Sequence, residues 1–465
     1  MVTGARGGGG VEELKQAACA WAEEARRMGA REAEIYVQDS GGVTIKVFGG
    51  EVEELRSSAS RGVGVRVLDG GRLGYAYCSG LEPEEVRRTI RDAINNARYS
   101  TPDEHNRLPE GAAEGLVSPE GLGMYQPETE EMPVEGKVEL ALRLEELARG
   151  QDPRIRAVES AAYSDSVYRV ALANTGGFCG AYRGCDCHCY VAPIAGEGEG
   201  SQSGFSFAVG KKPSDLDLEG CAREAAGHAL MLLGAESMPS RRTAVILDNL
   251  IAAEFLGVLA GALSAEAVLK GRSLLAGRLG ESIGSDKLTL VDDALMPSGM
   301  ATAPFDDEGV PSRRQEIVKD GVLRGYLHTV YTASRSGTAS TGNARRGSYR
   351  ERPRVSPSNF YLDPGERSRE EILREVGEGV LVLQLVGVHA GANPISGEIS
   401  VGALGMLLQG GEPHRPLREI TIAGNLLELL KSLSMKGDDL RFLPLGGSLG
   451  CPTIVFDGVM VAGRS

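Results

Sequence analysis

A β-meander is encoded by residues 33–77, AEIYVQDSGGVTIKVFGGEVEELRSSASRGVGVRVLDGGRLGYAY. Apolar residues alternate there with polar residues or glycine, which is the period of a strand with one buried face. Clusters of Asp, Ser and Gly interrupt the alternation and are typical of turns. The pattern predicts strands at 33–37, 43–48, 63–68 and 73–77, with turns at 39–42 and 69–71.

Helical periodicity flanks the meander on both sides. Before it, Leu14 and Trp21 fall on one face of a helix expected over residues 11–29. After it, Pro83 stands where proline suits the first turn of a second amphipathic helix. Helix, meander and helix together predict an N-terminal α+β domain over residues 1–100.

The rest of the chain divides into three expected parts. Residues 101–133 mix acidic residues with repeated Pro and Gly and predict a surface linker. Residues 134–238 contain helical and strand patterns and predict a central α+β domain. Strand patterns dominate residues 239–465, which we expect to form a large C-terminal domain. The predicted fold class is α+β, with a strand-rich middle region and a strand-rich C-terminal domain.

Local signals add detail to these parts. Ser164-Asp165-Ser166 predicts a turn between strands at 155–163 and 167–173. Asp320-Gly321 between apolar runs predicts a β-hairpin. The run 380–388 is almost entirely apolar and predicts a strand that is buried on both faces.

Composition and charge narrow the functional class. The chain has 465 residues and a formal net charge of −14, and such an acidic surface repels nucleic-acid phosphates. No apolar segment reads as a membrane span, and the Gly-rich residues 1–10 lack the apolar core of a signal peptide. Eight scattered cysteines favour reduced thiols over a disulfide scaffold. These features predict a cytoplasmic protein that binds neither membranes nor nucleic acid.

The first candidate for a metal site is the group Cys179, Cys185, Cys187, His188 and Cys189. Cys185, Cys187 and Cys189 lie at i, i+2 and i+4, so on a strand they share one face with neighbours ~6–7 Å apart. A zinc ion needs thiolates closer together than that, usually from a Cys-x-x-Cys knuckle. Three thiols that face a core therefore explain the pattern better than a metal site.

Three further groups contain reactive or charged residues. His389 follows the buried run and precedes a turn, where functional residues occur, although a packing role is favoured. Asp306-Asp307-Glu308 can be read as a cation site, as an acid and base, or as a solvated turn. Five arginines between residues 345 and 354 could bind the carboxylates of a peptide or partner, or pair with this protein's own acids. These patterns assign no catalytic residue and no metal ligand.

Five segments of the second half form an ordered series of motifs. They are Ala262–Ser273, Pro304–Pro311, Ser340–Arg345, Gly391–Gly397 and Thr421–Leu427. Together they resemble the TldD/PmbA family, whose members have been described as modulators of DNA gyrase and as metallopeptidases. The helix–meander–helix start is similar to the first domain of that family.

The family contains two types of chain. The TldD type carries His-Glu-x-x-x-His on the helix that opens its last domain, which implies a zinc site with the glutamate as base. The matching positions here are Leu256, Gly257 and Gly261, and none of them can bind zinc. No cysteine occurs at 439–445, where the family's further ligand would fall. The chain therefore resembles the PmbA type, also called TldE, which lacks the metal motif.

This resemblance implies a non-catalytic role beside a catalytic partner. The two types form a heterodimeric zinc metallopeptidase that cleaves unfolded or extended peptides. This chain would shape the chamber and grip the substrate without a cofactor of its own, and a TldD-type chain would supply the zinc. Residues expected to contact substrate or partner are Asn343, Arg345, Arg346, His389 and Asn393.

Three alternatives stay open at this point. The chain could be a self-sufficient metallopeptidase that uses the 185–189 segment, or a homodimer that binds peptides at an unrecognised site. It could also be a non-enzymatic regulator of DNA topology, although the charge of −14 argues against direct DNA contact. Replacing Arg345 and Arg346 with alanine is expected to weaken heterodimer formation or peptide turnover.

Overall fold

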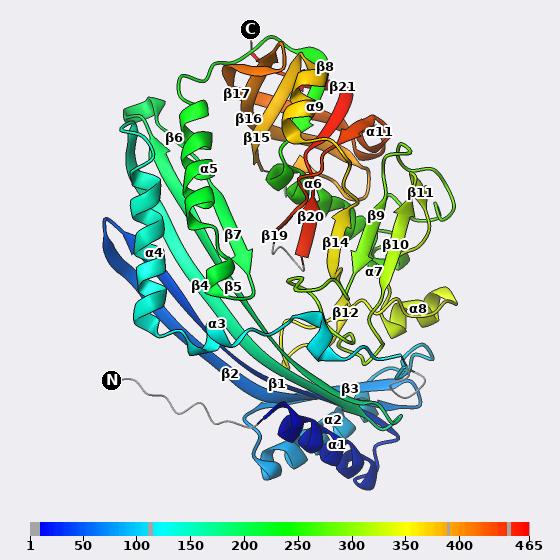
Figure 1. The fold of residues 1–465 in the computed structure, drawn as a ribbon. Helices are drawn as coiled ribbons and strands as arrows, with labels where there is room; N and C mark the ends of the chain where they lie inside the picture. The colour runs from blue at the N-terminus through cyan, green and yellow to red at the C-terminus, as the bar shows by residue number, and fades with distance from the viewer. Residues whose placement is uncertain (1–9, 110–114, 388–390, 444–447, 465) are drawn as a thin grey trace.

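A curved antiparallel sheet formed by residues 32–210 occupies one side of the molecule (Figure 1). The computed structural model describes residues 10–109, 115–387, 391–443 and 448–464. The strand order is β3-β2-β1-β4-β5-β6, and β7 pairs with β5. The strands are β1 (Glu32–Phe48), β2 (Glu51–Asp69), β3 (Arg72–Ser79), β4 (Ile155–Asn174), β5 (Cys179–Ala195), β6 (Gln202–Ser203) and β7 (Ser206–Gly210).

Two predicted turns are wrong, because both segments lie inside long strands. Residues 39–42 belong to β1, and residues 164–166 belong to β4. The two segments meet where the strands pair, with Gly42 opposite Ser166 and its neighbour Val43 opposite Asp165. A Cβ atom on Gly42 would lie 2.3 Å from the Asp165 carbonyl oxygen. Glycine is therefore required there by the close approach of two strands and not by a turn.

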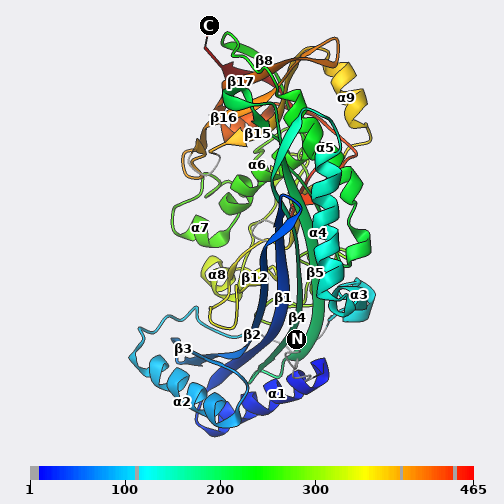
Figure 2. The ribbon, with the colours of Figure 1, turned by 90° about the vertical axis from the view of Figure 1, so that its left-hand side faces the viewer.

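The period-two alternation decides what each face of the sheet contacts. On β1, Ile35 and Val37 pack with α1 and α2 at one end, and Ile45 packs with α4 and α5 at the other (Figure 2). Tyr36 points to the opposite face and packs with Phe305 of the C-terminal region. The helices are α1 (Val11–Arg27), α2 (Pro83–Tyr99), α4 (Val134–Arg149) and α5 (Leu218–Met231). The α+β class, with its helix–meander–helix start, is confirmed.

Helix α2 lies directly on strand β3, and Gly74 makes this contact sterically possible. A Cβ atom at position 74 would lie 1.9 Å from the Ala93 carbonyl oxygen and 2.5 Å from the Ala97 nitrogen. We expect Gly74→Ala to push α2 off the sheet and to lower the free energy of unfolding by about 1–3 kcal/mol or more. Urea unfolding measures this change, with Gly325→Ala as control because a Cβ there meets nothing within 4 Å. Equal stability of the two variants would contradict the prediction.

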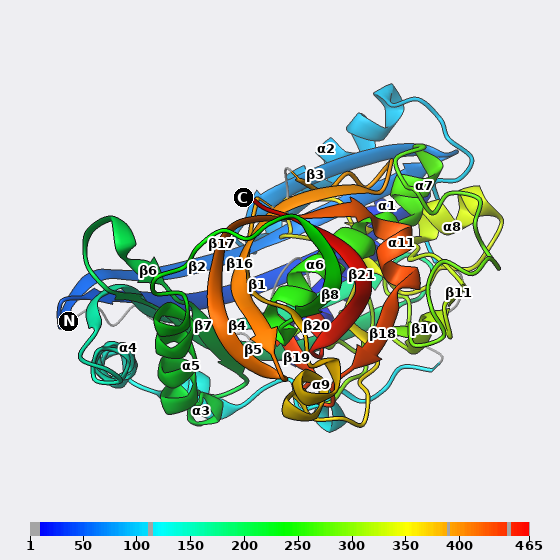
Figure 3. The ribbon, with the colours of Figure 1, turned by 90° about the horizontal axis from the view of Figure 1, so that it is seen from above.

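Five strands of the C-terminal region close into a ring, which Figure 3 shows from above. The order is β17-β16-β15-β8-β21, and β17 pairs back onto β21. Strand β18 extends the sheet beside β21. The strands are β8 (Arg241–Leu247), β15 (Gly379–Val386), β16 (Glu398–Gln409), β17 (Glu412–Asn425), β18 (Leu433–Lys436) and β21 (Ile454–Ala462). Strand β15 accounts for most of the buried strand predicted at 380–388: its first five residues are buried, its last three are exposed or half-buried, and residue 388 lies outside the described residues.

A second sheet of six strands, in the order β11-β10-β9-β14-β20-β19, lies next to the ring. Helix α6 (Asn249–Ala262) packs against both, and its Leu259 shares one apolar core with Leu247 of β8 and Leu290 of β9. Although α6 is apolar, no helix in the described ranges is both long and apolar enough to cross a membrane. The strands are β9 (Leu290–Asp293), β10 (Arg314–Lys319), β11 (Val322–Leu323), β14 (Asn359–Leu362), β19 (Arg441–Leu443) and β20 (Ser448–Cys451).

Short elements complete the described fold. They are α3 (Pro127–Glu131), α7 (Ala265–Leu269), α8 (Val330–Ser336), α9 (Arg369–Val376), α11 (Leu426–Lys431), β12 (Ala344–Arg345) and β13 (Arg354–Val355), with 3₁₀ turns at Pro119–Leu122, Gly198–Gly200 and Pro213–Asp215. The predicted hairpin at Asp320-Gly321 is confirmed as the connection between β10 and β11. Both central residues have positive φ, as this tight turn requires.

One pair of cysteines corrects the prediction of reduced thiols. Cys19 of α1 and Cys179 at the start of β5 form a disulfide, with their Cα atoms 6.2 Å apart. The bond joins two residues that are 160 positions apart and fastens α1 to the sheet. The other six cysteines have free thiols.

Candidate functional site

Helix α6 occupies the place where the resemblance would put a zinc motif. Leu256 is buried and lines a small apolar cavity with Cys451, while a Cβ on Gly257 would meet Leu449 at 3.2 Å. Leu256, Gly257 and Gly261 have no side-chain donor atoms, so these positions do not fit a zinc ion. Burial also raises the pKa of Cys451, whereas zinc binding needs the thiolate.

Cys185, Cys187 and Cys189 of β5 are buried on one face of the strand, as their spacing predicts. Cys185 and Cys187 point their thiols at the carbonyl oxygens of Lys211 and Gly210, at 3.1 and 3.5 Å. Burial raises the pKa of both thiols, which favours the protonated form. Within the described part of the chain, no three His, Cys, Asp or Glu side chains gather as a metal site would require.

A buried ion cluster joins the sheet to the C-terminal region. Arg66 of β2 binds Glu34 of β1 at 2.5 Å and Glu308 at 2.7 Å. Arg346 pairs with the same Glu34, and its backbone N–H donates to Asp307 at 2.6 Å. All five of these residues have buried side chains, so the solvated-turn interpretation of residues 306–308 is wrong. Acids and arginines here neutralise one another across the interface.

The electrostatics of this cluster follow from its burial. Burial alone would raise the pKa of Glu34, but the Arg346 and Arg66 guanidiniums outweigh it and hold the pKa below its usual value. Burial and then the Glu308 carboxylate raise the pKa of Asp306 to about 7. Asp306 also accepts backbone N–H bonds from Glu308, Val310 and Ala344 at 2.9–3.0 Å, which oppose that rise and fix the turn.

The residues predicted to contact substrate or partner occupy different environments. Asn343 is buried and donates to Asp292 at 2.7 Å, while Arg345 donates to the Ala301 carbonyl oxygen. Arg346 belongs to the buried ion cluster. Asn393 is exposed, and its side-chain oxygen accepts the N–H groups of residues 395 and 396. His389 lies outside the described residues.

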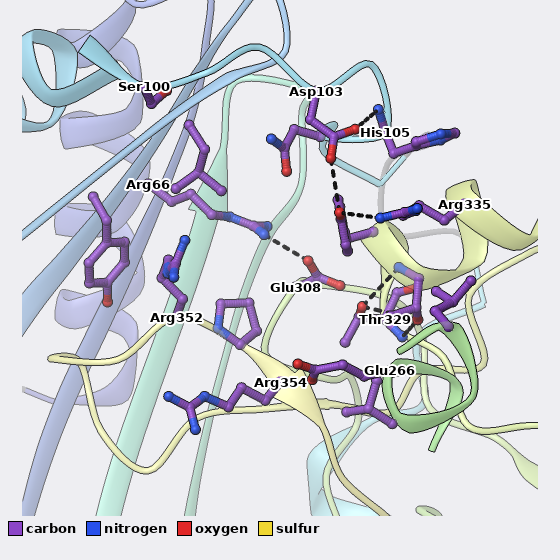
Figure 4. Close-up of a pocket in the computed structure, with 18 of the residues that line it drawn as sticks. Arg66, Ser100, Asp103, His105, Glu266, Glu308, Thr329, Arg335, Arg352 and Arg354 are labelled. Carbon is purple, nitrogen blue, oxygen red and sulfur yellow. Dashed lines mark hydrogen bonds and ion pairs between the residues drawn. The ribbon is translucent and has the colours of Figure 1, made fainter. Parts of the chain in front are cut away.

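A large cavity lies between the N-terminal region and the C-terminal region (Figure 4). Its volume is about 1440 Å³, which exceeds the roughly 300–1,000 Å³ of an ordinary small-molecule pocket. The lining comes from β2 and β3, from residues 100–106, from α7 and α8, and from residues 350–355. Arg345 and Arg346 do not line it, but their neighbours Arg350, Arg352 and Arg354 do.

Hydrogen bonds between distant segments hold the walls of this cavity. The Tyr75 hydroxyl donates to the carbonyl oxygens of Tyr349 and Glu351, both at 2.8 Å. On the other side, the Tyr331 hydroxyl donates to Asp103 at 2.9 Å, and Figure 4 shows Arg335 beside them. The backbone N–H of His105 and then Tyr331 help to lower the pKa of Asp103. The walls are thus fixed relative to each other before any ligand arrives.

Sequence reasoning missed the N-terminal contribution to this region. The alternation in the sequence puts Arg66 on the polar side of a meander strand, and the composition of residues 101–133 predicts only a surface linker. One signal in the sequence is that Glu34 and Arg66 are each the single charged residue within a mostly apolar strand segment. Such charges indicate that the second face of a sheet is covered rather than solvated.

Comparison with protein families identifies matches along most of the chain. Residues 33–97 match PmbA/TldA metallopeptidase domain 1, residues 127–233 match the central domain, and residues 240–463 match the C-terminal domain. The first match begins just inside β1 and ends just inside α2, whereas the other two matches begin and end at or beside the ends of elements. Domain 1 and the central domain contribute strands to one sheet.

Relatives of known name match over nearly the full length. Metalloprotease PmbA of Escherichia coli O157:H7 is 29% identical over 93% of this chain and 92% of its own. The metalloprotease TldD homolog of Haemophilus influenzae is 26% identical over 93% of both chains. The solved structure of TldE from Thermococcus kodakarensis has a TM-score of 0.87 at 27% identity, covering 96% of this chain and 99% of that one.

A structure from Thermotoga maritima, of a protein named as a modulator of DNA gyrase, also has a TM-score of 0.87, at 29% identity. It covers 97% of this chain and 100% of its own. Matches to all three domain profiles, in order, agree with the motif series in the second half of the sequence. The chain therefore belongs to the PmbA/TldD metallopeptidase family.

Proposed function

We propose that this chain is a non-catalytic, TldE-type subunit of a two-chain zinc metallopeptidase. A TldD-type partner supplies the zinc ion and the general base, and this chain completes the chamber and grips an extended peptide. The proposal rests chiefly on α6, where Leu256, Gly257 and Gly261 stand in place of two histidines and a glutamate. The likeness to a structure named TldE supports the same assignment.

The fold suits the binding of an extended peptide. Within the described residues, strand β7 pairs with no strand other than β5, and the Arg441 side chain donates to the Phe207 carbonyl oxygen of β7. An open edge can add a peptide strand by backbone hydrogen bonds, which recognises extended chains with little regard to sequence. Asn393 and the turn that contains it are exposed, and its contact with partner or substrate stays a prediction.

Metal content and reconstitution test this function. We expect the purified chain alone, prepared without chelators or a histidine tag, to carry substoichiometric zinc by mass spectrometry and to cleave no unfolded peptide. Mixed with a His-Glu-x-x-x-His chain from the same genome, it should give turnover that neither chain shows alone. The partner with its motif glutamate changed to glutamine is the control, because it can still pair but lacks the base.

Two results would contradict the proposal. Stoichiometric zinc in the isolated chain, together with peptide cleavage, would make it a self-sufficient metallopeptidase. Full turnover by the TldD-type chain alone would remove the need for this subunit.

A further inference from the structure

We propose that the large cavity of Figure 4 binds a carboxylate group of the extended peptide through Arg352 and Arg354. This inference rests on the proposed function, because it assumes that the chain grips a peptide, and it adds the chemical class of that peptide. The preferred ligand is an acidic segment, or a chain end with a free carboxylate. The reasons are the position of the arginines, their lack of partners and the rigidity of the walls.

The first reason is the side of the cavity where the arginines lie. Figure 4 shows Arg66, Arg352 and Arg354 along one side, and Glu266 and Asp103 on the other. The lining contains six Lys or Arg and five Asp or Glu residues, in a chain whose net charge is −14. With Arg66 already paired to Glu34 and Glu308, the exposed guanidiniums of Arg352 and Arg354 are the part of the lining that attracts an anionic group.

The second reason is that the arginines at the rim have no partner. Arg352 and Arg354 are exposed, and neither side chain forms an ion pair or hydrogen bond with another described residue. Several of the acids opposite are already engaged, since Glu308 binds Arg66 and Glu266 binds Lys270. A guanidinium offers paired N–H groups that match a carboxylate, so these two side chains suit that group best.

A third observation lies deeper in the cavity. Arg66 is 5% exposed, and its terminal nitrogens bind Glu34 and Glu308. Its Nε lies buried without a hydrogen-bond partner among the described residues. A buried N–H without a partner is costly and rare, so Arg66 retains a hydrogen-bond donor that the described residues do not use. Glu104 and Glu351 also line the cavity, and they would repel a carboxylate that approached from their side.

The walls are already in place for such a ligand. Tyr75 fixes the 349–351 segment that leads to both arginines, and Asp103 fixes α8 through Tyr331. The Ser334 hydroxyl and the His105 ring make a further contact at 3.1 Å. A site that is ordered in advance loses less conformational entropy when it binds.

Direct binding to the isolated chain tests the inference. The probes are three fluorescein-labelled peptides of equal length: one with several glutamates and blocked ends, its glutamine counterpart, and that counterpart with a free C-terminal carboxylate. Anisotropy titration should show at least one carboxylate peptide binding about 10-fold more tightly than the blocked glutamine peptide. The first and third peptides distinguish a side-chain carboxylate from a terminal one.

Variants assign the preference to the cavity. The double change R352Q and R354Q should reduce the preference to within about twofold and leave the unfolding midpoint unchanged, because both side chains are exposed. The matched control is R324Q with R418Q, which removes the same charge from exposed positions outside the cavity. That control should keep the full preference.

Each other outcome counts against the inference. Equal affinity for all three peptides, no binding, or a preference that survives R352Q and R354Q overturns it. A different result would contradict the proposed function, namely a TldD-type partner that cleaves peptides without this chain. That result would leave a carboxylate preference of the isolated chain in place.

Discussion

Replacing Arg66 with methionine is expected to lower the free energy of unfolding by about 3–5 kcal/mol. The guanidinium binds Glu34 and Glu308 in a site where all three side chains are at most 6% exposed. Without it, Glu34 keeps Arg346, but Glu308 keeps only the backbone N–H of Val330. An uncompensated carboxylate then stays buried between the sheet and the C-terminal region. Denaturant unfolding followed by fluorescence and by circular dichroism measures the loss.

The same strand offers a matched control for Arg66. Arg56 is also on β2, its side chain is 71% exposed, and it pairs with Glu54 at the surface. Arg56→Met should change the stability by no more than about 0.5 kcal/mol. If Arg66→Met does not fold, Glu308→Gln removes the same ion pair while it keeps the volume of the side chain. Losses as small as those of Arg56→Met in both cluster variants would show that the cluster does not hold the two regions together.

Lys137→Met should lower the free energy of unfolding by a similar amount, because it also leaves a buried carboxylate without its cation. Lys137 of α4 pairs with Asp165 in the middle of β4, and both side chains are at most 3% exposed. Its ammonium group also donates to the Thr129 carbonyl oxygen at 3.1 Å. Removal leaves Asp165 with the Tyr163 hydroxyl and one backbone N–H, so we expect a loss of about 3–5 kcal/mol.

Two further variants show whether the buried charge is responsible. Lys46→Met on β1 is the control, because that side chain is 40% exposed and its ion pair with Glu54 spans 3.7 Å. Adding Asp165→Asn to Lys137→Met should recover part of the stability, since the unpaired carboxylate is then gone. A double variant no more stable than Lys137→Met would mean that lost packing of the lysine chain, and not charge, explains the effect.

Local patterns in the sequence predict the helices α1 and α2 that flank the meander but cannot decide where the long strands end. Residues 40–42 and 164–166 both have turn composition, yet they lie inside the paired strands β1 and β4, where Gly42 is opposite Ser166. Small residues are needed there because one strand passes close to the backbone of the other, as the clash at Gly42 shows. The two segments are more than a hundred residues apart in the chain, so their contact produces no local period in the sequence. Each segment taken alone therefore resembles a turn.

The sequence predicts the part of the site that a motif marks, but it does not predict the part that depends on which residues are buried. The arginine-rich segment at 345–354 is visible in the sequence, and three of its members line the cavity. Whether an arginine points into a cavity or into a buried ion cluster depends on what covers the sheet. Tyr36 and Glu34 belong to the covered face, and only the packing of Phe305 and Arg346 on that face shows it.

The position of β1 has a consequence for how the chain folds during its synthesis. Strand β1 lies between β2, which follows it at once, and β4, which begins at residue 155. At a translation rate of roughly 5–20 residues per second, the β4 side of β1 waits on the order of ten seconds for its neighbour. During that interval the nascent meander presents a long, bare backbone edge of the kind that joins foreign strands. A ribosome-bound chaperone would protect this edge of the nascent chain from pairing with foreign strands. Slowly translated codons would do the same if they lie after β4 and not before it.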